Sequence, residues 1–106
     1  MSPRPYEVFL IRATFGFSTD PRPCVILEEP QANLVKVALI SSALDLHKPH
    51  LDFLIEESDW DFPATGLKRT SFVSGATFDE HSVSDLIKWL GRLEGSLKTR
   101  FVEWFG

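Results

Sequence analysis

The stretch RPCVILEEPQANLVKVALISS, residues 22–42, contains two short apolar runs separated by a turn. The runs at Cys24 to Glu28 and Leu34 to Ile40 are too short to predict helices, and both are rich in β-branched residues. The residues Pro30 to Asn33 between them are typical of turns. The stretch therefore predicts two strands that pair antiparallel through this turn.

Three further segments predict strands on the same grounds. Tyr6 to Ala13 and His50 to Glu56 combine apolar, aromatic and β-branched residues, and Thr70 to Phe78 does so around Gly75, where we expect a bulge or bend.

The loop at Thr14 to Pro23, between the first predicted strand and the run that begins at Cys24, is about ten residues long, which exceeds the two to five residues that usually close a hairpin. Long loops of this kind often carry function.

The segment after residue 81 allows two interpretations. Ser82 followed by Asp85 resembles a capping box, and the apolar residues after it have helical spacing, which predicts a helix from about Val83. Residues 86–93 also alternate with a period of two, which would make them a last strand.

The C-terminal segment predicts an amphipathic helix. Ser96 is a suitable N-cap, and Leu97, Phe101, Trp104 and Phe105 fall on one face at helical spacing. Five or six short strands with one or two helices suggest a mainly β fold. We expect a small β-barrel or half-barrel closed by the C-terminal helix.

Length and composition favour one small globular domain over residues 1–106. The chain is 43% hydrophobic and 25% charged, with a net charge of −4, so it offers no general attraction for polyanions. It contains neither an apolar run long enough to span a membrane nor a signal-peptide pattern near Met1, and we expect a cytoplasmic protein without membrane contact. The single cysteine, Cys24, is expected to fill core space.

The strongest chemical feature is an arginine beside serine hydroxyls. If the strands of residues 22–42 pair as predicted, Arg22 meets Ser41 or Ser42 at one end of the sheet. A guanidinium with a neighbouring hydroxyl can bind a phosphate through several hydrogen bonds. The alternative is a surface ion pair of Arg22 with Asp20, with serines that only end a strand.

Two other clusters could bind a metal in principle. Asp45, His47, His50 and Asp52 are close in sequence, and residues 56–61 include four acidic side chains. Such spacings are unspecific and acidic runs are usually solvated, so we expect no metal and no cofactor.

Four motifs together resemble the MazF/PemK toxins of bacterial toxin–antitoxin modules. They are RPCVIL at 22–27, VALISS at 37–42, GLKRTSFV at 66–73 and LGRL at 90–93, in the family's order and spacing. The resemblance covers the chain from about Tyr6 to its C-terminus. It implies an SH3-like barrel, a strand rather than a helix within residues 86–93, and a homodimer. It also implies metal-independent, sequence-selective cleavage of single-stranded RNA at short sequences, which a cognate antitoxin blocks.

The resemblance also implies site residues. The reactive pair carries over to Arg22 and Ser41, with Ser42 as the alternative if the register slips by one residue. The RNA's own 2′-hydroxyl would act as nucleophile, which requires no nucleophile from the protein, and His47 is a candidate general base by proximity in sequence.

Other residues are candidates for substrate binding. Phe15 and Phe17 could stack on unpaired bases or pack under the loop as core. Lys68 and Arg69 could contact phosphates or lie in a solvated turn.

A different class of function fits the same barrel. In this hypothesis the protein is a non-catalytic interaction module, and a hydrophobic groove of the barrel that could include Trp60 and Phe62 binds an antitoxin-like peptide by helix docking or strand addition. The acidic residues that flank Trp60 and Phe62 would suit a basic partner. Capping of one barrel end by these two residues is the structural alternative.

Overall fold

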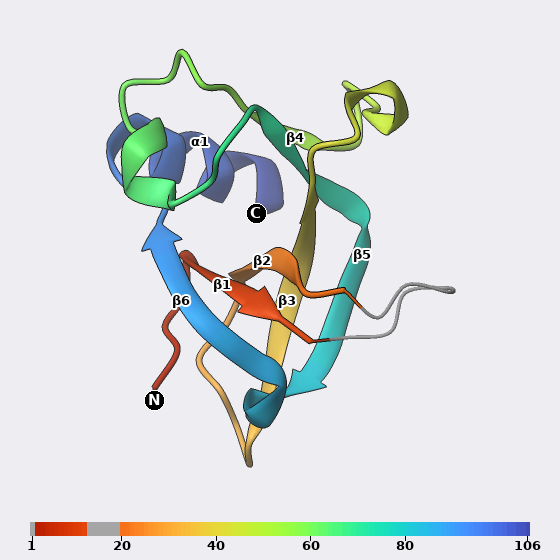
Figure 1. The fold of residues 1–106 in the computed structure, drawn as a ribbon, viewed down its shortest axis with the longest axis vertical. Helices are drawn as coiled ribbons and strands as arrows, with labels where there is room; N and C mark the ends of the chain where they lie inside the picture. The colour runs from red at the N-terminus through yellow and green to blue at the C-terminus, as the bar shows by residue number, and fades with distance from the viewer. Residues whose placement is uncertain (1, 13–19) are drawn as a thin grey trace.

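A computed structural model describes residues 2–12 and 20–106 and is mainly β. One curled six-stranded sheet has the order β4-β5-β3-β2-β1-β6 and is antiparallel at every pairing (Figure 1). The strands are β1 (Glu7–Ile11), β2 (Arg22–Ile26), β3 (Leu34–Ser41), β4 (Phe53–Ile55), β5 (Ser71–Ser82) and β6 (Leu86–Arg92). The helices are α1 (Gly95–Phe105) and the short 3-10 turns η1 (Leu44–Leu46), η2 (Phe62–Thr65) and η3 (Val83–Asp85).

The predicted hairpin of β2 and β3 is confirmed. Gln31 and Leu34 exchange two backbone hydrogen bonds of 2.9 Å across the turn, with Ala32 and Asn33 at φ of 51° and 67°. Two successive residues with positive φ make the tight turn that suits the right-handed twist of a hairpin, and Asn tolerates this conformation well.

The predicted irregularity at Gly75 is also present. The register of β3 with β5 shifts between Ala38 and Ile40, so β5 carries extra residues there and bends. A Cβ atom on Gly75 would collide with the carbonyl oxygen of Leu51, so only glycine lets the two backbones approach this closely.

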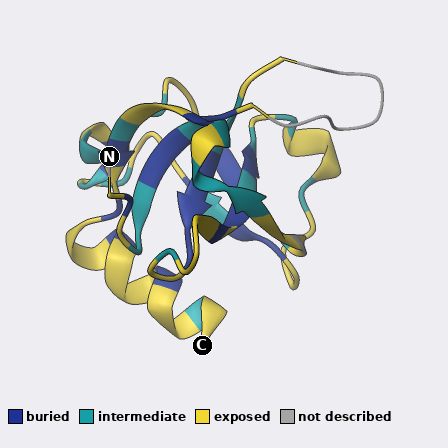
Figure 2. Cartoon of the chain, turned by 90° about the horizontal axis from the view of Figure 1, so that it is seen from below, coloured by how far each residue is buried: buried dark blue, intermediate teal, exposed yellow. Residues whose placement is uncertain are grey.

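The curled sheet is apolar on both faces. One cluster is built from β1, β2, β3 and β6 and includes Phe9, Cys24 and Val37. The other lies between the sheet and α1, where Leu97 and Phe101 are fully buried. Figure 2 shows the buried strands in the centre and the exposed outer surface of α1. The half-barrel closed by an amphipathic C-terminal helix is therefore confirmed.

The helix predicted from about Val83 is wrong. Ser82 does accept a hydrogen bond from the Ser84 amide at 3.3 Å, but only the 3-10 turn η3 follows it. Residues 86–92 then pair with β1 as the edge strand β6. Strand pairing thus overrides a local helical spacing, and the alternative with a period of two is confirmed.

The start of α1 also differs from the prediction. Ser96 lies inside the helix rather than at its N-cap, which is Glu94 without a side-chain cap. Asp61, from the segment before η2, accepts hydrogen bonds from the backbone amide and the hydroxyl of Ser96 at 3.0 and 3.1 Å. The cap therefore comes from a residue that is distant in sequence.

The predicted strand at His50 to Glu56 is shorter than expected, since only Phe53–Ile55 pairs with β5. Within residues 2–12 and 20–106, no helix is long and apolar enough to cross a membrane.

Candidate active site

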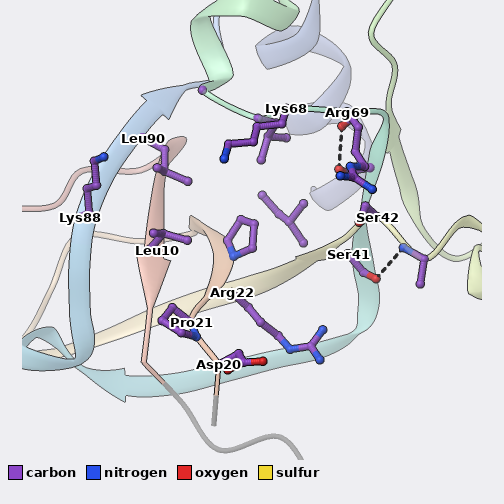
Figure 3. Close-up of a pocket in the computed structure, with 16 residues that line it drawn as sticks. Leu10, Asp20, Pro21, Arg22, Ser41, Ser42, Lys68, Arg69, Lys88 and Leu90 are labelled. Carbon is purple, nitrogen blue, oxygen red and sulfur yellow. Dashed lines mark hydrogen bonds between the residues drawn. The ribbon is translucent and has the colours of Figure 1, made fainter. Parts of the chain in front are cut away.

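Arg22 and Ser41 come together at one end of the β2–β3 hairpin. The register pairs Cys24 with Leu39, and continued by two residues it sets Arg22 opposite Ser41. Both residues line one cavity of about 550 Å³ (Figure 3). The structure thus places Arg22 and Ser41 together in the lining of one cavity.

Ser41 and Ser42 differ in their surroundings. The Ser41 hydroxyl oxygen accepts a hydrogen bond from the Ala43 amide at 3.1 Å, which orients it and leaves its proton available to a ligand oxygen. Ser42 follows the end of β3, is exposed and lines the same cavity. The β2–β3 register sets Ser41, rather than Ser42, across from Arg22.

The charge of the cavity is mostly positive. Among its described lining residues, Arg22, Lys68, Arg69 and Lys88 are basic and Asp20 is acidic. Figure 3 shows Lys68 pointing into the cavity from the rim opposite Arg22. Basic side chains gathered around a concave site attract anions locally even where the net charge of the protein is −4.

Lys88 is a candidate that sequence reasoning missed. It lies on β6, where it pairs across the strands with Leu10 of β1, and both residues line the cavity. A lone lysine within the apolar segment 86–90 was the available signal. This lysine can be assigned to the cavity only once the segment is known to be a strand that pairs with β1.

The structure does not bring His47 into this cavity. Its ring packs against Phe72 with the centroids 5.5 Å apart, and its Nε2 atom is buried without a hydrogen-bond partner among the described residues. The lining of the cavity does not include His47, so the geometry gives no support to it as a general base. Phe15 and Phe17, the predicted stacking residues, lie outside the described residues.

Three of the acidic residues weighed as metal ligands have structural partners. Asp59 forms an ion pair with Arg100 at 2.8 Å, and Asp61 caps α1. Asp52 accepts backbone hydrogen bonds from Lys48 and Gly75, each at 2.9 Å. Within the described part of the chain, no three potential ligands gather as a metal site would require.

Trp60 and Phe62, the two aromatic residues of the interaction-module hypothesis, lie in different environments in the structure. Phe62 is buried in the core that packs against α1, whereas Trp60 is 93% exposed. They therefore do not form one binding surface.

Cys24 is fully buried between β1 and β3, as expected of a core residue. Burial raises the pKa of its thiol to about 12, against a small opposing effect of a hydrogen bond with the backbone of Phe9. The thiol is therefore neutral at physiological pH and unreactive.

Comparison with known proteins supports the fold through structure. No family model and no curated protein matches the sequence. Among solved structures, the chain is similar to the Mycobacterium tuberculosis toxin MazF-mt6, with a TM-score of 0.71 and 22% sequence identity. The match covers 94% of this chain and 92% of the other. The two proteins therefore share a fold, which is the fold that the sequence resemblance predicts.

Proposed function

We propose that this protein is a MazF/PemK-type toxin that cleaves single-stranded RNA without a metal ion. The single observation that carries the proposal is the convergence of Arg22 and Ser41 on a cavity with a basic lining. The shared fold with a protein described as a MazF toxin supports it. A phosphodiester fits this cavity because it presents anionic oxygens to a guanidinium and a hydroxyl at once.

In the proposed reaction, the RNA supplies its own nucleophile. The 2′-hydroxyl oxygen attacks the adjacent phosphorus, and the bond from phosphorus to the 5′-oxygen breaks on the opposite side. The products are a 2′,3′-cyclic phosphate and a 5′-hydroxyl, and the proton lost from the 2′-oxygen is balanced by the one gained at the 5′-oxygen. The protein must therefore hold the chain in line and stabilise the charge of the transition state.

The basic residues and the serines of the cavity then have distinct roles. Arg22 donates hydrogen bonds to the non-bridging oxygens as negative charge builds up on them. Ser41 donates one further hydrogen bond and orients the phosphate. Ser42, Lys68 and Arg69 bind the RNA backbone on either side, and Lys88 adds a further positive charge.

The biological setting forms part of the same proposal. We assign the protein as the toxin of a toxin–antitoxin module in the cytoplasm, working as a homodimer and inhibited by a cognate antitoxin. Apolar side chains left exposed on β5 and α1, including Phe78 at 47% and Phe105 at 40%, offer surface for such partners.

The test is an RNA cleavage assay in EDTA. A long unstructured RNA is incubated with wild-type protein, with Arg22→Ala and with Arg4→Ala, whose exposed arginine does not line the cavity. We expect wild type and Arg4→Ala to cut at the same recurrent short sequences and Arg22→Ala to leave the RNA intact. RNA left intact by the folded wild-type protein would overturn the proposal and favour the non-catalytic interaction module.

A further inference from the structure

A second cavity adjoins the candidate active site. It has a volume of about 400 Å³, within the range of small-molecule sites, and shares Arg22, Ile40 and Ser41 with the first cavity. The Arg22–Ser41 pair therefore forms part of the wall between the two. A ligand bound at this pair would border both cavities.

The lining of the second cavity is different in character. Its apolar residues are Leu39, Ile40, Leu46, Leu51, Phe72 and Ala76. Besides Arg22, Lys48 is its only described basic residue, and Asp52 adds a negative charge. The first cavity suits phosphates, whereas this one suits a flat, largely apolar group with a polar edge.

Asp52 is held in a fixed position at this cavity. Its side chain is buried, with 8% of the residue exposed, and its two carboxylate oxygens accept the amides of Lys48 and Gly75. Each carboxylate oxygen can accept a second hydrogen bond. A fixed carboxylate repels a phosphate and accepts N–H groups such as those on the edges of nucleobases.

The cavity wall is rigid on the same side. The backbone of Leu51 lies against Gly75, and the Leu51 carbonyl oxygen accepts a hydrogen bond from Trp104 Nε1 of α1 at 3.1 Å. The wall is thus tied to both β5 and the helix. A preformed cavity binds its ligand without the cost of ordering a loop.

We propose that the second cavity binds one nucleobase of the RNA, next to the scissile phosphate, and reads its N–H edge through Asp52. This inference rests on the proposed function, since it takes the phosphate to lie at Arg22 and Ser41. The base would be unstacked from its neighbours and buried among the apolar side chains, which is how single-stranded RNA is recognised. The cavity would thereby select one position of the cleavage sequence.

The test uses two leucines of the same 3-10 turn. Leu46 lines the second cavity and is 64% exposed, whereas Leu44, 46% exposed, does not line it. We expect Leu46→Ser to lower kcat/KM for a preferred RNA by roughly tenfold, in line with the loss of contacts to one base. It should also flatten the base preference at one position beside the cut, and Leu44→Ser should behave as wild type.

RNA with one abasic nucleotide distinguishes the loss of base binding in this cavity from a general loss of activity. On RNA that lacks the base at the selected position, wild type should cleave as slowly as Leu46→Ser, and the variant should lose nothing further. Ala76→Phe, which fills the cavity from β5, should reproduce the effect of Leu46→Ser. Unchanged base preference in both folded variants, with cleavage retained, would overturn the subsite but leave the nuclease standing.

Binding of a non-cleavable oligonucleotide, with 2′-deoxyribose at the cut, keeps the two proposals distinguishable. If wild type binds this oligonucleotide more tightly than the matched abasic oligonucleotide but cuts no RNA, the proposed base-binding subsite is supported and the proposed nuclease function is overturned. Equal affinity for the two would overturn the subsite whatever the outcome of the cleavage assay.

Discussion

The carboxylate of Asp61 accepts hydrogen bonds from both the backbone amide and the hydroxyl of Ser96, 35 residues further along the chain. Gly95, at φ 54°, packs directly against the same carboxylate. The first turn of α1 is therefore capped by a loop that also leads into η2. This contact joins the helix that closes the half-barrel to the segment that packs on β6.

We expect Asp61→Ala to lower the free energy of unfolding by about 1–2 kcal/mol, as for other lost helix caps. Urea denaturation monitored by circular dichroism measures this change. Asp61→Asn, which retains an acceptor oxygen, should lose less, and Glu56→Ala, an exposed acid of the same run, should lose little. Equal stability of Asp61→Ala and Glu56→Ala would contradict the capping role.

Replacement of the two serines separates their tasks. Ser41→Ala should lower kcat about 10–100-fold with KM nearly unchanged, because it would remove the hydrogen bond that we propose Ser41 donates in the transition state. Ser42→Ala should change kcat by less than about threefold, as a peripheral contact does. Single-turnover cleavage of a short fluorogenic RNA measures both, and the reverse order would mean that Ser42 is the reactive serine.

The chemistry of Arg22 can be tested by a conservative change. Arg22→Lys keeps the positive charge but loses the planar fork of donors, so it should recover only a small part of the activity lost in Arg22→Ala. The measurement is kcat/KM in EDTA for the three proteins. Full activity of Arg22→Lys would show that the site needs only a point charge.

RNA binding should depend on salt through the basic residues of the cavity. Each phosphate contact contributes about −0.7 to the slope of log K against log salt for single strands. Lys88→Ala and Lys68→Ala should each reduce the steepness by about that amount for a non-cleavable RNA. Lys36→Ala, an exposed lysine outside the cavity, serves as the control and should leave the slope unchanged.

The buried thiol of Cys24 should contribute to stability in a defined pH range. Its pKa rises from 9.0 to about 12 on folding, so the folded protein retains the thiol proton that the unfolded chain loses. The contribution is therefore fully present below pH 9.0 and decreases as the pH rises toward about 12. Compared with Cys24→Ala, wild type should lose stability more steeply over that range in urea denaturation, and parallel curves would contradict this.

The β2–β3 hairpin was predictable because its signals are local. Apolar runs, turn residues and strand length all lie within residues 22–42, and together they predict the pairing that brings Arg22 to Ser41 or Ser42. The same holds for the bend at Gly75 and the buried face of α1, since each depends on residues that are near neighbours in the chain.

The segment after Ser82 shows where local signals fail. Its helical spacing is real, yet residues 86–92 gain more by pairing with β1 at the edge of the sheet than by forming an isolated helix. Only the position of β1 in space reveals this. The motif resemblance indicated the strand correctly, because a family pattern carries information about distant pairings.

By itself, the sequence determined the hairpin, the mainly β class, the closing helix and the approach of Arg22 to Ser41 or Ser42, whereas the choice of Ser41 depended on the register of the folded sheet. The tertiary structure alone decided that Lys88 joins this pair, that Asp61 caps α1, and that a second, apolar cavity adjoins the first. The physical reason is the range of the interactions. Turns and periodicity act between neighbours in the chain, whereas caps, charge clusters and cavities arise where the curled sheet brings distant residues together.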